Sequence, residues 1–306
     1  MKKLMLCVLW LVPGLALAQF PDLSKVQVKS QHVAGNVHML EGAGGNIGVS
    51  VGPDGILLVD DQFAELVPKI RAALARLPRG KGKKLEYVLN THWHFDHTGS
   101  NAVFSRDAIL VAHKQVRTRL MNGQEIPAVG MKVPPAPKEA LPVITYEQGL
   151  SIFFNGEEIQ VTHLPGGHTD GDSMVYFTSS NVLHLGDQFT ADKYPFIDLS
   201  SGGSAEGYLR NLERVLQTLP EGVKIIPGHG QVGGRAELER FTEMMRESVD
   251  LVKGRIAAGK TVEQVKAEGM PEKYKSYSHA FVGPEQWLET LYTSLSAKKP
   301  ADAAKP

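Results

Sequence analysis

The segment His92-Trp93-His94-Phe95-Asp96-His97 decides the fold assignment and follows a strand-like run at residues 85–90. Side chains alternate along an extended chain, so its first two histidines can point to the same side and share one metal ion. Asp96 and His97 follow on a tightening loop and can face a second ion. Imidazole and carboxylate are the nitrogen and oxygen ligands that zinc prefers. The alternative is a polar cluster that arose by chance. Only 11 of the 306 residues are histidine, so chance would rarely place three histidines and an aspartate within six positions.

The composition is that of a globular protein with one large or two small domains. Apolar residues make up 42% of the chain and charged residues 22%, which is enough to build a core. Lys+Arg and Asp+Glu are both 33, so the formal net charge is zero. This balance argues against a nucleic-acid partner. We expect a small-molecule substrate and no membrane association after signal removal; the sequence indicates no oligomeric state.

Residues 1–18 have the pattern of a secretory signal. A positive start precedes an apolar core at residues 4–17, and Ala16-Leu17-Ala18 is typical of a cleavage site. The alternative is a membrane anchor, for which the run is short against the roughly 20 residues required. Cys7, the only cysteine, lies inside this segment, so the mature chain would offer no thiolate ligand. We expect cleavage after Ala18 and a periplasmic or secreted protein.

The order of apolar runs predicts an α/β fold. Strands are expected at Val26–Val28, Val37–Leu40, Ile47–Val51, Ile56–Val59, Leu85–Leu89 and Ala108–Ala112, and in a second meander at Val143–Tyr146, Ser151–Phe154, Glu158–His163, Met174–Thr178 and Val182–Leu185, with a last strand at Val223–Ile226. Helices are expected near 66–77, 99–104, 114–121, 209–219, 236–258, after the capping box that begins at Thr261, and near 287–295. This succession predicts two sheets packed face to face with helices outside, in four layers.

Residues 122–142 change in composition and are rich in proline and glycine. Proline fixes φ and removes a hydrogen-bond donor, so we expect a surface excursion without regular strand pairing. It could be a simple connector or a lid over the site, since long loops are often functional. The excursion belongs to one domain at residues 19–296. The small, polar segment at 297–306 is expected to be a disordered tail.

Three further candidate ligands lie in glycine-containing turns that follow strands. These are His168 in Gly167-His168-Thr169, Asp187 in Gly186-Asp187, and His229 in Pro227-Gly228-His229-Gly230. Glycine lets the backbone turn sharply and approach an ion. Sites built from loops at strand ends are a common arrangement.

Together, the motifs H-x-H-x-D-H, G-H-T, G-D and P-G-H-G resemble those of the metallo-β-lactamase superfamily, over roughly residues 30 to 230. The resemblance implies an αββα sandwich with two zinc ions at one edge, although iron or manganese stays open because such ligands hold several metals. It implies that the first ion is bound by His92, His94 and His168, the second by Asp96, His97 and His229, and that Asp187 bridges them. Asp96 would also be catalytic, orienting the attacking hydroxide.

Asp187 separates branches of this family. Several true β-lactamases carry cysteine there, whereas aspartate resembles the glyoxalase II, lactonase and phosphodiesterase branches. The predicted function is an exported dinuclear zinc hydrolase whose activated hydroxide attacks an ester, lactone, thioester or β-lactam-type carbonyl. The alternatives are a β-lactamase proper, a phosphoester or sulfoester hydrolase, and a non-hydrolytic metal-binding redox or accessory protein.

Four other side chains are candidates for supporting the ligands. Asp60 either orients a ligand or caps a turn. His184 either orients a ligand or is an ordinary strand residue. Asp172 is expected to fix the turn of His168. Tyr194 follows Asp187 and, with the loop at 202–204, is a candidate for lining a substrate cleft.

Overall fold

The fold is that of a computed structural model, which describes residues 22–297. The expected signal segment and residues 298–306 of the expected tail lie outside the described residues, so the domain boundaries stay predictions. Within residues 22–297, no helix is both long enough and apolar enough to cross a membrane.

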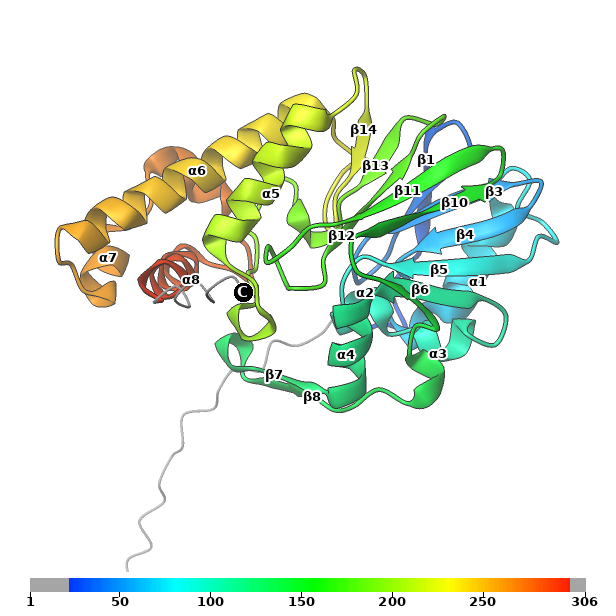
Figure 1. Ribbon diagram of the computed structural model, residues 1–306, viewed down its shortest axis with the longest axis horizontal. Helices are drawn as coiled ribbons and strands as arrows, with labels where there is room; N and C mark the ends of the chain where they lie inside the picture. Colours follow the sequence, from blue (N-terminus) through cyan, green and yellow to red (C-terminus); the bar gives the residue numbers. More distant parts are fainter. Residues whose placement is uncertain (1–21, 298–306) are drawn as a thin grey trace, which may run out of the picture.

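Two main sheets organise the molecule (Figure 1). The first has the order β1-β2-β3-β4-β5-β6-β9, with β1 at Lys29–Ala34, β2 at Val37–Glu41, β3 at Ile47–Gly52, β4 at Gly55–Val59, β5 at Leu85–Asn90, β6 at Ile109–His113 and β9 at Ile144–Tyr146. The second has the order β10-β11-β12-β13-β14, with β10 at Gly149–Phe154, β11 at Glu157–His163, β12 at Ser173–Phe177, β13 at Val182–His184 and β14 at Lys224–Ile226.

The helices connect the strands or follow them. The α-helices are α1 at Val67–Arg76, α2 at Phe95–Thr98, α3 at Asn101–Phe104, α4 at Lys114–Asn122, α5 at Ala205–Thr218, α6 at Arg235–Ala257, α7 at Val262–Glu268 and α8 at Pro284–Ser296. Short 3-10 helices are η1 at Ala64–Leu66, η2 at Pro127–Val129, η3 at Lys138–Ala140, η4 at Gly186–Gln188, η5 at Leu199–Ser201 and η6 at Glu272–Tyr277. The predicted capping box of α7 is present, with reciprocal bonds between Thr261 and Gln264.

The core between the sheets shows why they stack. Leu57 and Leu89 of the first sheet share one buried cluster with Ile159 and Phe177 of the second. Along each strand, side chains that face the other sheet alternate with side chains that face outward. The apolar side chains on the outer face of each sheet need a separate cover. The predicted four-layer α/β arrangement is therefore confirmed.

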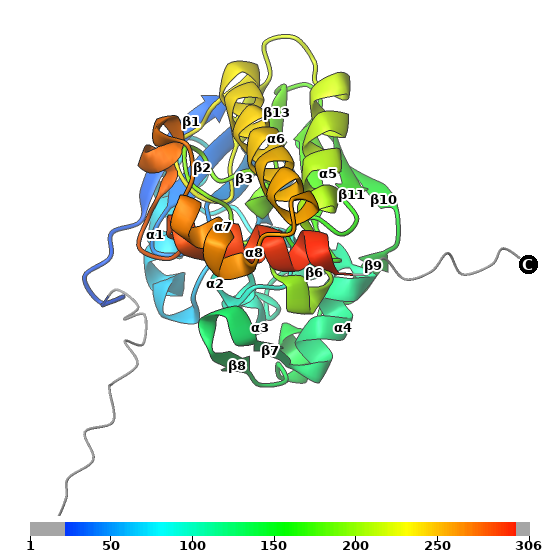
Figure 2. The same ribbon diagram turned by 90° about the vertical axis from the view of Figure 1, so that its left-hand side faces the viewer.

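Helices provide that cover on both outer faces. Ile70 and Leu74 of α1 join a buried cluster on the first sheet. The second sheet is covered by α5, α6 and α8, with Phe241 and Trp287 fully buried. Figure 2 shows these three helices together with α7 on the side facing the viewer. Burial of a large aromatic side chain is worth a few kcal/mol, roughly 1.5–3 for a Phe.

Two predicted strands differ from the structure. Val26–Val28 is not a strand, because Lys69 Nζ holds this segment against α1 by donating to the carbonyl of Leu23 at 3.0 Å and that of Val26 at 2.6 Å. The first strand is instead β1, a mostly exposed edge strand. Strand β9, predicted within the second meander, pairs in parallel with β6 and completes the first sheet.

The proline-rich excursion is more regular than predicted. Strands β7 at Gln124–Ile126 and β8 at Met131–Val133 pair in antiparallel register, so the expectation of no regular pairing was wrong. The prolines flank these strands or lie in the turn, where their missing donors are not needed. Figure 1 shows this hairpin beside α4. Ile126 is buried in a cluster with Trp93 of the metal motif.

Candidate metal centre

The seven predicted ligands come together where several strands end. His92 and His94 follow β5, Asp96 and His97 lie in α2, His168 lies between β11 and β12, Asp187 lies in η4 after β13, and His229 follows β14. The Asp96-His97 pair sits on a helical turn rather than on the loop that we predicted. Four loops from two sheets thus converge on one place.

The first group of ligands is His92, His94 and His168, whose candidate ligand atoms all lie within 4.8 Å of one another. His168 Nε2 lies 2.8 Å from His94 Nδ1. His92 Nε2 is buried and has no hydrogen-bond partner. A buried nitrogen without a hydrogen-bond partner is costly, so this atom is suited to bind a metal ion.

The second group is Asp96, His97 and His229, whose candidate ligand atoms also lie within 4.8 Å of one another. The Nε2 atoms of the two histidines are 3.4 Å apart. Asp187 stands between the groups: its Oδ2 is 3.7 Å from His168 Nε2 and 3.5 Å from His229 Nε2. One carboxylate therefore reaches both groups.

Asp60 fixes the ring of His97 from behind. Its Oδ2 accepts a bond from His97 Nδ1 at 2.8 Å and another from the Thr91 hydroxyl at 2.7 Å. Its Oδ1 accepts from the Thr91 backbone N–H at 2.7 Å. With its hydroxyl hydrogen donated to Asp60, Thr91 Oγ1 can accept from His92 Nδ1, 3.0 Å away. Both rings thus turn Nε2 toward the centre, which is how partners behind a metal-binding histidine act.

Asp60 also adopts a strained backbone conformation, with φ at +65°. Non-glycine residues in this region cost of order 1 kcal/mol or more and cluster at functional sites. Asp60, His92 and His97 also form a third group able to hold an ion. Because both carboxylate oxygens of Asp60 already accept hydrogen bonds, we assign it to orientation and not to binding.

Sequence reasoning missed the partners of the other two rings. Asp198 Oδ2 lies 3.1 Å from His94 Nε2, which leaves His94 Nδ1 as its ligand atom. The backbone carbonyl of Phe196 accepts from His168 Nδ1 at 2.7 Å. Asp198 Oδ1 also accepts from the backbone N–H of Ser201, so its sequence context is that of an ordinary turn cap. The only sequence signal for the role of Asp198 behind His94 is that it follows Asp187 closely in the chain.

Two glycines make room for the ligands. A Cβ on Gly45 would lie 2.0 Å from His97 Cε1, and one on Gly228 would lie 1.9 Å from Asp187 Oδ1. Asn46, also missed, holds the loop that carries His229, because its side-chain amide donates to the Gly230 carbonyl at 2.8 Å. The close approach of backbone to ligand explains the glycine-rich turns.

Comparisons with known proteins agree with this geometry. The family model described as the metallo-β-lactamase superfamily matches residues 42–229. The chain belongs to the metallo-β-lactamase superfamily. The predicted resemblance and the prediction of a metal-dependent hydrolase are thereby confirmed at the level of the superfamily.

Relatives and solved structures within the superfamily have low identity to this chain. A probable metallo-hydrolase of Methanocaldococcus jannaschii is 29% identical, over 53% of this chain and 78% of the relative. A metallo-beta-lactamase type 2 of Bacteroides fragilis is 22% identical, over 55% and 62%. An acyl-coenzyme A thioesterase of Gallus gallus is 25% identical, over 56% and 65%. The structure of a metallo-beta-lactamase from Pontibacter korlensis has a TM-score of 0.59 and 15% identity, over 72% and 99%.

The charges of the candidate metal centre suit cations. Burial alone would raise the pKa of Asp96, but the neighbouring His97 and His229 lower it to about 2. Burial lowers the pKa of His229, but Asp187 and Asp96 raise it to about 9. Protons on these histidines therefore balance the two carboxylates. A bound metal would displace those protons, because ligand histidines must be neutral.

The site fits metal binding of the kind that the superfamily implies. His92, His94, His97 and His168 each have one ring nitrogen in a hydrogen bond to a partner behind the ring, so the other nitrogen faces inward and is the one that would bind a metal. Burial and the neighbouring His94 lower the pKa of His168 to about 4, which keeps it neutral. Neutral imidazoles and carboxylates suit zinc, and equally iron or manganese.

The structure also places the remaining candidates. Both oxygens of Asp172 accept bonds from Thr169, the Oδ1 from its hydroxyl at 2.6 Å and the Oδ2 from its backbone N–H at 2.9 Å, which ties down the turn after His168. His184 Nε2 donates to the carbonyl of Asn46 at 3.0 Å, and so supports the loop of His229 indirectly.

Tyr194 lies inside the core instead of along an exposed cleft. It is 1% exposed, its hydroxyl donates to the Tyr274 carbonyl at 2.7 Å, and its ring stacks on Trp287. Gly203, from the loop predicted beside it, approaches the carbonyl of His168 so closely that a Cβ would lie 2.3 Å away. The loop at residues 202–204 therefore packs against the turn that carries His168 and supports that turn.

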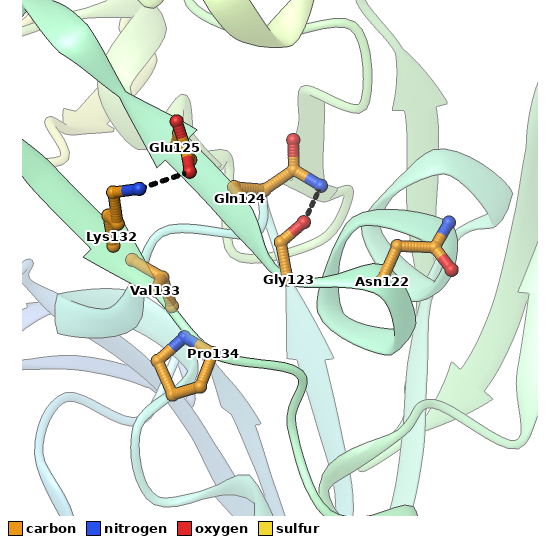
Figure 3. A pocket seen from close by; sticks show the side chains of 7 residues that line it. All are labelled: Asn122, Gly123, Gln124, Glu125, Lys132, Val133 and Pro134. Atoms are coloured by element: carbon orange, nitrogen blue, oxygen red, sulfur yellow. Dashed lines mark hydrogen bonds and ion pairs between the residues drawn. The ribbon is translucent and has the colours of Figure 1, made fainter.

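The hairpin region contains a hollow of about 340 Å³ lined by residues 122–125 and 132–134 (Figure 3). None of its lining residues is a candidate ligand. Its only ion pair joins Lys132 and Glu125 at 2.7 Å, in the described part of the chain. We assign no chemistry to this hollow.

Proposed function

We propose that this protein is an exported dinuclear zinc hydrolase that opens the carbonyl of an ester, lactone or thioester. The observation that carries the proposal is the position of Asp187. Its carboxylate lies 3.7 Å from His168 Nε2 in one ligand group and 3.5 Å from His229 Nε2 in the other. A carboxylate shared in this way suits two ions held side by side.

His92, His94 and His168 would hold one ion, Asp96, His97 and His229 the other, and Asp187 both. When bound, such ions supply Lewis acidity, which brings the pKa of a water toward neutrality and polarises the bond under attack. The chain contributes orientation. Asp60 and Asp198 hold two of the ligand rings, so that little reorganisation is needed during the reaction.

Asp96 faces the open side of the centre, with 22% of its side chain exposed. Its pKa, held at about 2 by His97 and His229 against the effect of burial, keeps it ionised at neutral pH. We therefore assign Asp96 Oδ2 to accepting a hydrogen bond from the attacking water and fixing its direction. A carboxylate this acidic is a weak base, so it orients the water more than it stores its proton.

Charge favours a carbonyl substrate over a phosphoester or sulfoester. Within residues 22–297, the ion pairs of Asp96 and Asp187 are all with histidines, and Lys193 pairs with neither. An anionic substrate usually meets a fixed arginine or lysine. Aspartate at position 187, in place of cysteine, and a relative named as an acyl-coenzyme A thioesterase support ester-type bonds over β-lactams.

A substrate panel tests this proposal. Purified protein should contain about two zinc ions per chain and should hydrolyse at least one of a chromogenic ester, lactone or thioester. Preference for a β-lactam, a phosphodiester or a sulfate ester would refute the assigned bond type. Inactivity of the metal-loaded protein toward the whole panel would favour the non-hydrolytic alternative.

Variants test the role of Asp96. Asp96→Asn should lower kcat at least about a hundredfold, the cost of a misdirected attacking group. Asp192→Asn changes an exposed aspartate to the same amide and should retain the wild-type rate. Equal rates in the two variants would remove Asp96 from the mechanism.

We propose export from the N-terminal sequence pattern. Expression of the full chain in a bacterial host should yield a periplasmic protein whose N-terminus, determined by sequencing, is Gln19. A cytoplasmic product that retains residues 1–18 would refute export and leave the hydrolase proposal intact.

A further inference from the structure

An aromatic pair adjoins the first ligand group. The ring of Phe196 lies 6.0 Å from that of His94 and 6.1 Å from that of His168, measured between centroids. Its backbone carbonyl also accepts a hydrogen bond from His168 Nδ1. The ring of Phe281 lies 5.4 Å from Phe196 in an edge-to-face arrangement. Phe196 therefore links the ligand histidines to Phe281.

Phe281 comes from a part of the chain that the family model does not match, since the match ends at residue 229. Three hydrogen bonds join its segment to Tyr194: Tyr194 N donates to the Tyr277 carbonyl at 2.8 Å, its hydroxyl donates to the Tyr274 carbonyl, and His279 Nε2 donates to the Tyr194 carbonyl at 3.0 Å. The position of Phe281 is thus built into the fold.

Phe281 is nevertheless 43% exposed. Phe196 packs on the cluster of Trp93, as do the half-buried Val129 and Met131 of the hairpin region. Apolar side chains consequently continue from Phe281 through Phe196 to the hairpin cluster, beside the largely buried rings of His94 and His168. Exposed aromatic surface beside a polar reaction centre is a common way to hold the apolar part of a ligand.

We propose that Phe196 and Phe281 form an apolar wall of the substrate site and that this wall favours acyl groups with an alkyl chain over the acetyl group. The inference rests on the proposed function, because it places the scissile carbonyl at the metal ligands. The alkyl chain would lie along the aromatic rings and remove Phe281 from water. Phe281 is a specificity residue here, and no step of bond cleavage depends on it.

Hydrolysis of p-nitrophenyl octanoate and p-nitrophenyl acetate by the full-length, metal-loaded protein provides the first test. The wild type should have the higher kcat/KM for the octanoate. In Phe281→Ala this preference should fall about tenfold, the lower range for a hydrophobic specificity contact, and the change should be in KM. Phe281→Leu should restore most of it. Phe153→Ala, which removes a 79% exposed phenylalanine from strand β10, is the matched control and should keep the wild-type preference.

Binding calorimetry separates this inference from the proposed function. Octanoate, titrated into the same proteins, should bind the wild type and the Phe153→Ala control about tenfold more tightly than Phe281→Ala. Equal affinity of all three proteins, or a chain-length preference unchanged in Phe281→Ala, would overturn the wall. If the wild type hydrolyses neither ester, but binds octanoate more tightly than Phe281→Ala does, the proposed function fails and the apolar wall stands.

Discussion

Gly45→Ala offers a direct test of whether His97 must occupy its present position. Gly45 lies in the turn between β2 and β3, and its φ is outside the left-handed region, so alanine brings no backbone strain there. The new Cβ would lie 2.0 Å from His97 Cε1 and 2.4 Å from its Nε2, whereas ordinary contacts begin at 3.4 Å. The ring must therefore withdraw by roughly 1 Å or more.

That displacement has a large expected cost. His97 is held by its bond to Asp60 at 2.8 Å, and its Nε2 faces Asp187 at 3.2 Å and His229 at 3.4 Å. A ring moved by about 1 Å cannot keep these distances, and a misplacement of this size costs about a hundredfold in rate. We expect Gly45→Ala to lose the second metal ion while the group containing His92 keeps the first.

The assay combines metal content with kinetics. Elemental analysis should fall from about two metal ions per chain to about one, and kcat/KM on the best panel substrate should fall about a hundredfold. Gly254→Ala is the control, because nothing lies within 4 Å of its Cβ on helix α6. Alanine there should leave metal content unchanged and stabilise the helix by about 0.5–1 kcal/mol. A folded Gly45→Ala protein with two ions and the wild-type rate would refute the assigned role of His97.

Three further substitutions test the supporting structure. Asp198→Asn removes the charge behind His94 and should weaken metal binding by about 10–100-fold in competition with a chromophoric chelator; wild-type affinity would contradict the orienting role. His113 and His163 stack at 3.8 Å, and burial lowers the pKa of both, so the unfolded chain binds more protons and the free energy of unfolding falls as pH drops below 6.5. His163→Phe keeps a stacked ring and should lessen the loss of Tm between pH 7 and 5; an equal loss in both proteins would exclude this pair as the cause. Trp287→Ala should cost about 3–5 kcal/mol in denaturant unfolding, because Trp287 is fully buried.

The sequence identified the residues that the structure brings together, because each candidate ligand carries a local signal. The three histidine turns and the Gly186-Asp187 turn all follow strands, and glycine marks the positions where backbone approaches a ligand. Side-chain alternation then limits which residues can face one ion. Local pattern was sufficient because the site is built at strand ends.

The partners behind the ligands were not predictable in the same way. Asp198 is 104 residues from His94, and its neighbours Ser200 and Ser201 suggest a capped turn, which the structure also contains. Thr91 directly follows a strand, a common position for threonine that does not indicate a role beside His92. Their roles arise from the packing of loops that are distant in sequence, and no spacing rule connects them.

Strand pairing shows the same limit. The apolar pattern identified the segment of β9 but not its partner β6, because a parallel pair requires a long crossover. Here the crossover comprises α4 and the β7–β8 hairpin. The segment at 26–28 alternates like a strand, yet carbonyl bonds to Lys69 hold it as a loop. Tertiary contacts decided both cases.

The exposure of the ligands gives the direction from which substrate approaches. His92 and His168 are 1% exposed, whereas side-chain exposure reaches 22% for Asp96 and 30% for His229. Under the proposed function, water and the scissile carbonyl enter over Asp96 and His229, because the other ligand group is closed by protein. The same closed group has Phe196 against its rings. An acyl group that lies on Phe196 would thus place its carbonyl toward the exposed ligands, so substrate orientation and chain-length selection would depend on the same aromatic ring.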